Sequence, residues 1–261
     1  MEIDSSDLLA VCSGSLVGFI LGVIGGGGSI LAVPLLVYVV GVKSPHVAIG
    51  TGALAVAVSA FANLLDHARR GHVCWPAALP FAASGVGGAI VGSTLGKHTD
   101  GQKLLTLFGL MMIVIAAMMA RRTGGDGAAP PKVGRHQIIP ILSIGAAVGL
   151  LAGFFGIGGG FLVVPGLIAA TAMPLIVAIG SSLVSVTAFG ISTAANYAAS
   201  GLIDWRLAAL FVGGGIVGGL VGSRLATFLA PKKRALSLLF AALVATVGFY
   251  VTIRGIMNII G

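Results

Sequence analysis

The strongest constraint on this chain is an apolar motif, broken by glycines, that occurs twice. The first copy has glycines from Gly25 to Gly28 and then Pro34, and the second has glycines at 156 and 158–160 and then Pro165. Each glycine weakens an α-helix by about 1 kcal/mol, so we expect the chain to be unwound at both runs. Apolar segments interrupted by glycine and proline at matching places in two halves are typical of secondary transporters.

The composition predicts an all-α polytopic membrane protein. Apolar residues make up 57% of the 261 residues, charged residues only 8%, and the mean hydropathy is +1.10, which is too apolar for a water-soluble domain. A helix needs about 20 apolar residues to cross a bilayer. Six stretches are long enough for one crossing, and two longer stretches contain the glycine runs: 47–65, 73–95, 103–120, 176–198, 207–229 and 235–257, then 8–41 and 138–172.

Several other functions are excluded by the same residues. The net charge of +8 does not indicate nucleic-acid binding, because lysine and arginine lie in short loops, where they set membrane topology. Cys12 and Cys74 lack metal-ligand spacing, so we expect packing residues, no metal and no cofactor. The segment 1–7 has no basic region, so no cleaved signal peptide is expected. Without a catalytic set of side chains in the apolar segments, the protein is predicted not to be an enzyme.

The two halves of the chain repeat each other at an offset of about 130 residues. Besides the glycine runs, the segment from His46 matches that from Ile176, and Gly71 to Trp75 matches Gly201 to Trp205. We predict a first transmembrane repeat at 1–120, a linker at 121–136 and a second repeat at 137–261. Each repeat has four apolar segments, and the first of each is expected to be broken into a helical hairpin. This makes eight segments and up to ten helices.

Rows of glycine at fourfold spacing predict close packing of helices. They are Gly14, Gly18 and Gly22 with Gly145, Gly149 and Gly153, and Gly88, Gly92 and Gly96 with Gly214, Gly218 and Gly222.

Positive charge predicts the orientation of the repeats. If each glycine-broken segment returns to its starting side, one side of the membrane holds ten of the fifteen lysines and arginines; with single crossings the split is eight to seven. Positive residues gather on the cytoplasmic side, so the first arrangement is favoured. It implies inverted repeats in the inner membrane, with the linker 121–136 cytoplasmic and both termini outside.

The glycine runs are the main candidates for a binding site. Unwound backbone at membrane depth survives where it is buried in protein or lines a polar cavity, and the N–H groups that open the next half-helix attract anions. A purely structural turn is the alternative. Further candidates are the hydroxyls of Thr51, Ser181 and Ser182, which follow matched Ala-Ile-Gly sequences and otherwise bond back to a carbonyl one turn earlier.

Two amides complete the set, and interhelical hydrogen bonds are their alternative role. The candidate substrate-binding residues are Gly25, Gly26, Gly27, Gly28, Ser29, Thr51, Asn63, Gly156, Gly158, Gly159, Gly160, Ser181, Ser182 and Asn196. Titratable residues near the helix ends, such as His67 and Arg206, are expected to reach out to water. A proton-relay role is considered only for His46 and His72.

The broken motifs ending at Pro34 and Pro165, the Ala-Ile-Gly-Thr and Ala-Ile-Gly-Ser helix starts, and the paired Gly71/Trp75 and Gly201/Trp205 resemble the TauE/SafE family of membrane transporters, also described as sulfite exporters. The resemblance spans nearly the whole chain. It implies an inner-membrane carrier for sulfite, sulfoacetate or related organosulfonates. Two half-helix N-termini with nearby hydroxyls would hold such an anion without a buried cation.

The expected function is therefore secondary transport of a small sulfur-containing anion, in the direction of export, at a central site between the repeats. The expected partners are that anion and the lipid bilayer, without nucleic acid; the glycine-rich outer faces permit a homodimer. A passive anion channel and a membrane scaffold subunit that transports nothing are the alternatives.

Overall fold

The computed structural model describes residues 5–24, 26–121, 134–156, 159–229 and 233–260, which fold into ten α-helices and contain no strand. Most of the expected linker, residues 122–133, lies outside the described part. The elements of the first half are α1 (Ser5–Ile24), the 3₁₀-helix η1 (Gly26–Leu31), α2 (Ala32–Pro34), the π-helix η2 (Leu35–Val39), α3 (Pro45–Arg69), α4 (Trp75–His98) and α5 (Gly101–Arg121). Those of the second half are α6 (Arg135–Phe155), α7 (Gly160–Thr171), α8 (Leu175–Ala198), α9 (Trp205–Leu229) and α10 (Lys233–Ile260).

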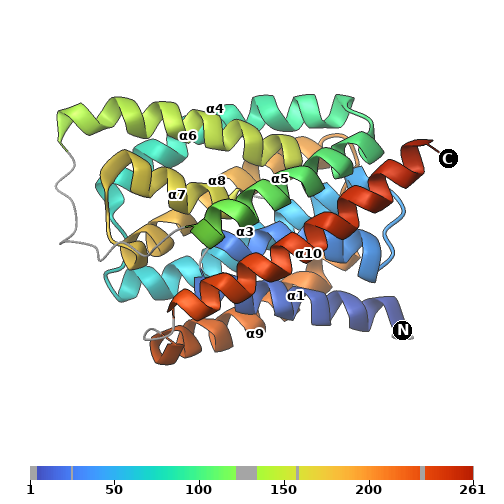
Figure 1. The fold of residues 1–261 in the computed structure, drawn as a ribbon, viewed down its shortest axis with the longest axis horizontal. Coiled ribbons are helices and arrows are strands. Elements are labelled where there is room, and N and C mark those ends of the chain that lie inside the picture. Colours follow the sequence, from blue (N-terminus) through green and yellow to red (C-terminus); the bar gives the residue numbers. More distant parts are fainter. Residues whose placement is uncertain (1–4, 25, 122–133, 157–158, 230–232, 261) are drawn as a thin grey trace.

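Seven of these helices are long and apolar enough to cross a membrane: α1, α3, α4, α5, α6, α8 and α9. The helices form an elongated bundle (Figure 1). Both long apolar stretches are divided at their glycine runs, since α1 is followed by the short η1, α2 and η2, and α6 is followed by the 12-residue α7. All-α membrane architecture is therefore confirmed.

The short helices run back along the long helices that precede them. A Cβ atom on Gly28 would lie 2.6 Å from the backbone nitrogen of Leu21, and residues 40–44, after η2, share a cavity with Asp7 at the start of α1. In the second half, Gly159 packs on Ala152 and Gly166 on Ile144. As a result, α1 and α3 begin at the same end of the bundle, which we call the α3-start end. The opposite end, where α8 begins, is the α8-start end.

Glycine rows hold the two halves together, as the sequence predicts. Gly14, Gly18 and Gly22 of α1 face residues 211, 215 and 219 of α9, so these helices run in the same direction. A Cβ on Gly18 would lie only 1.9 Å from the carbonyl oxygen of Gly215. The mirror contact is α6 on α4, where Gly145, Gly149 and Gly153 face residues 81, 85 and 89. The second predicted row, Gly88 to Gly96 with Gly214 to Gly222, faces backbone carbonyls of α6 and α1.

The middle of the bundle is formed by α3 and α8, which run in opposite directions. Gly50, near the start of α3, contacts Leu202 beyond the end of α8, whereas Gly180, near the start of α8, contacts His72 beyond the end of α3. Helices α5 and α10 also pack together. Two of these contacts, α3 with α8 and α5 with α10, join corresponding helices of the two halves. The other two, α1 with α9 and α6 with α4, are equivalent to each other when the halves are exchanged.

Candidate functional site

The second glycine break is not helical at Gly156 and Gly159, its described residues before α7. Helix α6 ends at Phe155, and Gly156 and Gly159 both have a φ of +67°, the left-handed region that glycine adopts without strain. Gly156 is packed so tightly on Ile49 of α3 that a Cβ would lie 1.9 Å from that side chain. Gly160 then starts α7. The prediction of unwound backbone is confirmed here, while Gly158 lies outside the described residues.

The first glycine break differs from the sequence prediction. The chain from Gly26 through Ser29 is wound as the 3₁₀-helix η1, so the expectation that it is unwound is wrong for these residues. A 3₁₀ turn tightens the backbone while keeping hydrogen bonds between its own groups, which meets the requirement for satisfied polar groups at membrane depth. Ser29 is fully buried. Gly25 lies outside the described residues, and Gly27 lies within η1.

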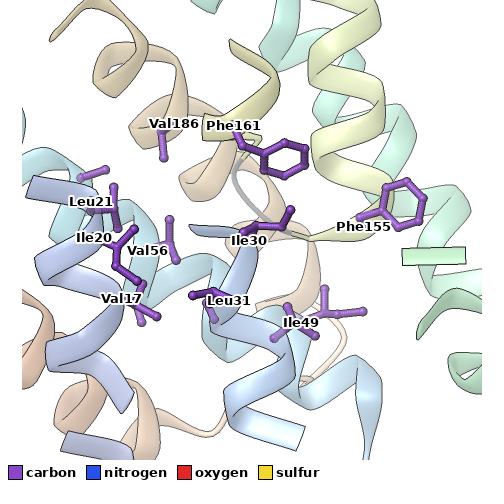
Figure 2. Packing of buried hydrophobic residues seen from close by; sticks show 14 of the residues in the cluster. Val17, Ile20, Leu21, Ile30, Leu31, Ile49, Val56, Phe155, Phe161 and Val186 are labelled. Carbon is purple, nitrogen blue, oxygen red and sulfur yellow. The ribbon is translucent and has the colours of Figure 1, made fainter. Parts of the chain in front are cut away.

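The space between the two breaks is filled by apolar side chains. η1 packs against α7, and Ile30 of η1 and Phe161 of α7 belong to one buried cluster with Leu21, Phe155 and Val186 (Figure 2). Ile30 is 0% exposed and Phe161 6%. A desolvated anion among these side chains would be costly, so this conformation is closed at its centre.

Thr51 and Ser181 act as matched anchors for backbone turns. The Thr51 hydroxyl accepts a hydrogen bond from the Asp204 N–H (3.0 Å), and the Ser181 hydroxyl accepts one from the Cys74 N–H (2.9 Å). Both side chains are fully buried. Each hydroxyl therefore ties α3 or α8 to the turn that precedes the third long helix of the other half, a role that the sequence alone does not predict.

Two other candidates bond back along their own helices. The Ser182 hydroxyl donates to the Ile179 carbonyl (2.7 Å), and the Asn63 amide nitrogen donates to the Ser59 carbonyl (2.9 Å). Asn63 also packs directly on Gly219 of α9. Neither side chain is brought together with the glycine breaks by these contacts, and their part in anion binding stays a prediction.

Asn196 is the centre of a polar network between α4 and α8. Its amide nitrogen donates to the hydroxyls of Ser93 (2.6 Å) and Thr94 (3.0 Å), and its side-chain oxygen accepts from Lys97 Nζ (2.7 Å). The interhelical alternative is thus realised. Sequence reasoning missed Lys97, since it lies just beyond the apolar stretch 73–95. The available signal was an isolated cation two residues after the last apolar residue of that stretch.

The α3-start end also holds an ion pair beside a cavity. Arg206 donates to the largely buried carboxylate of Asp7 (2.6 Å). The pair lines a cavity of about 470 Å³ together with Lys43 and Asp204. Because α1 and α9 belong to different halves, this pair is another connection between them.

At the α8-start end, two histidines lie close together. The rings of His67 and His72 have centroids 5.6 Å apart, and neither Nδ1 has a hydrogen-bond partner among the described residues. His67 is only 5% exposed, so the expectation that it reaches out to water is wrong. The neighbouring Asp66 instead pairs along the helix with Arg70 (3.0 Å).

An all-α chain with seven candidate spans and short helices that follow glycine breaks is a polytopic membrane protein. A family model described as "Sulfite exporter TauE/SafE" matches residues 10–251, and the chain belongs to this family. It is therefore a member of a transporter family and not an enzyme.

Similar proteins carry consistent names. A "Probable membrane transporter protein" of Xylella fastidiosa strain Temecula1 is 50% identical over 252 residues, covering 95% of each chain. YunE of Bacillus subtilis, a "Probable membrane transporter protein", is 28% identical and covers 84% of this chain and 88% of its own. MJ0441 of Methanocaldococcus jannaschii, named likewise, is 29% identical over 67% and 68%. No solved structure matches the chain at a significant level.

Proposed function

We propose that this protein is a secondary transporter that exports a small sulfur-containing oxyanion, such as sulfite, sulfoacetate or a related organosulfonate, by alternating access. The observation that carries the proposal is that equivalent helix contacts occur twice, with the two halves exchanged. The first helix of each half packs on the third long helix of the other, and the short helices η1 and α7 meet between them. A pair of broken segments at the interface of two repeats is where such carriers bind substrate.

In this proposal the repeats are inverted. Residues 1–120 and 137–261 form the two repeats, and the linker 121–136 lies in the cytoplasm with both termini outside. Support comes from α3 and α8, corresponding helices that run in opposite directions, and from the ten lysines and arginines that this arrangement gathers on one side.

The anion site is formed by backbone as the repeats move. The candidate donors are the N–H groups of Gly26 to Ser29 and of Gly159 and Gly160, at the starts of η1 and α7. In the closed conformation, Ile30 and Phe161 fill the space between these starts. Moving one repeat against the other would separate the two side chains and admit an anion from one side at a time.

Export needs no coupling ion in this scheme. An inside-negative potential of 100 mV contributes about 2.3 kcal/mol for each negative charge that moves outward. That energy corresponds to about a fiftyfold concentration ratio. A uniporter with modest affinity for its anion would therefore be sufficient.

The proposal is tested by counterflow in proteoliposomes. Vesicles loaded with excess unlabelled sulfite, sulfoacetate, taurine, thiosulfate or sulfate are diluted into a trace of the labelled compound, with protein-free vesicles as the control. We expect saturable, transient accumulation of the label for a subset of these compounds. Flux without saturation or counterflow would indicate a channel, and no flux from folded protein would contradict transport by this chain alone.

A further inference from the structure

In the described part of the chain, the ammonium group of Lys97 has no carboxylate partner. Its Nζ donates to the side-chain oxygen of Asn196 (2.7 Å), to the Asn196 carbonyl (3.0 Å) and to the Ser200 hydroxyl (2.9 Å). All three acceptors are neutral. Arg70 and Arg206, by contrast, each have a carboxylate within 3.0 Å. Among the described residues, Lys97 thus carries a positive charge at a helix interface that no ion pair compensates.

A buried hydroxyl without a partner among the described residues lies close to the turn of α4 that carries this lysine. Tyr197, which follows Asn196, is 0% exposed, and its hydroxyl has no hydrogen-bond partner in the described part of the chain. A Cβ on Gly96, the residue before Lys97, would lie 3.4 Å from that hydroxyl. Leaving a buried hydroxyl unpaired costs about 1–3 kcal/mol. A ligand oxygen that accepts a hydrogen bond from this hydroxyl would remove that cost.

The turn of α4 that carries Gly96 and Lys97 lies next to the second glycine break. Gly96 packs on the carbonyl oxygen of Phe154, two residues before Gly156. The offset of 130 residues places His67 at the position equivalent to Tyr197, and the His67 Nδ1 is also buried without a partner among the described residues. Each half therefore carries an unpaired polar atom at the same place, towards opposite ends of the bundle.

We propose that Lys97 and Tyr197 form an anion-binding station at the α3-start end, to which a small oxyanion passes from the second glycine break. This inference rests on the proposed transport function and adds the residues that recognise the anion. The ammonium supplies the charge, the phenol O–H donates one further hydrogen bond, and Asn196 and Ser200 hold the lysine in place. The probe used to test it is sulfite.

The test compares four variants. Lys97→Gln keeps a hydrogen-bond donor and removes the charge, Lys97→Arg keeps the charge, and Tyr197→Phe removes only the hydroxyl. Lys103→Gln, an exposed lysine in the first turn of α5, is the matched control for surface charge. Each is assayed for the KM and maximal rate of sulfite counterflow, and for the sulfite-dependent shift of thermal unfolding in detergent.

We expect Lys97→Gln to raise the KM about tenfold and Tyr197→Phe to raise it about threefold, in line with the loss of one charged and one neutral hydrogen bond. Lys97→Arg should stay within about twofold of the wild type, as should Lys103→Gln. Because the Tyr197 hydroxyl has no partner among the residues that the structure describes, Tyr197→Phe should unfold at the wild-type temperature or above in the absence of sulfite.

A merely structural role predicts a different result. If Lys97→Gln lowers the unfolding temperature while the KM and the sulfite-dependent shift of both variants stay at wild-type values, Lys97 is a clamp between α4 and α8 and the station is overturned. In that case normal counterflow leaves the transport function standing. If sulfite neither protects the wild type nor crosses the membrane, while another anion does, the station is overturned for sulfite and the carrier is retained. Absence of counterflow with every anion contradicts both.

Discussion

Thr51 and Ser181 occupy equivalent positions in the two halves, and the hydroxyl of each accepts a hydrogen bond from a backbone N–H of the other half. The N–H groups of Asp204 and Cys74 belong to turns that precede α9 and α4. Removing a buried acceptor leaves such a donor unpaired, at a cost of about 1–3 kcal/mol. At this scale the two residues stabilise the contact between the halves.

We therefore predict that Thr51→Val and Ser181→Ala each lower the free energy of unfolding by about 1–2 kcal/mol, whereas Thr51→Ser, which keeps the acceptor, has little effect. Thermal unfolding in detergent measures the change, and sulfite counterflow on the same samples measures the KM. A large rise in KM for Thr51→Val with unchanged stability would assign Thr51 to the anion site instead.

At the scale of elements, the contact of α1 with α9 depends on the absence of side chains. Gly18 and Gly215 bring the two backbones so close that a Cβ on Gly18 would meet the Gly215 carbonyl at 1.9 Å. Neither helix can yield locally, since rows of glycine continue the contact in both directions. Without a hydrophobic driving force between helices in lipid, this packing supplies much of the attraction.

Gly18→Ala is expected to destabilise the fold by more than about 3 kcal/mol, at the upper end of overpacking effects. Gly213→Ala is the matched control in α9, since a Cβ there meets nothing within 4 Å; it should be neutral or stabilising by up to about 1 kcal/mol. Size-exclusion profiles and thermal unfolding in detergent report both. Equal behaviour of the two variants would contradict direct backbone contact between α1 and α9.

The elements were predictable to different degrees for physical reasons. Hydropathy predicted α8 (Leu175–Ala198) at 176–198 and α3 (Pro45–Arg69) at 47–65, because a membrane span can be recognised by the length and apolar composition of its segment. The winding of Gly26 to Ser29 as a 3₁₀-helix was not predictable, because glycine permits several conformations and packing selects one. The Lys97–Asn196 network depends on which helices are neighbours, and spacing along one segment carries no such information.

At the scale of the whole molecule, the relative direction of the halves is open to a direct test. Arg69 and Ala199 are equivalent residues, 130 positions apart, and both are exposed near a helix end. Thr51, near the start of α3, contacts Asp204 in the turn after α8. Ala199 therefore lies at the α3-start end of the bundle, and Arg69, at the end of α3, lies at the α8-start end. A helix of 25 residues is about 37 Å long, which is enough to separate them across a bilayer.

We predict that Arg69→Cys and Ala199→Cys, each in a chain carrying Cys12→Ser and Cys74→Ser, react from opposite faces of the membrane. The cluster of basic residues near Arg69 favours the cytoplasm, so a membrane-impermeant maleimide should label Ala199→Cys in intact cells and Arg69→Cys only in inverted vesicles. Labelling of both from one face would mean parallel halves and would remove the basis for alternating access by exchange of repeats. Labelling from opposite faces in the reverse sense would keep the inverted repeats but place the linker outside, so that the Lys97 station would face the cytoplasm and receive the anion before export.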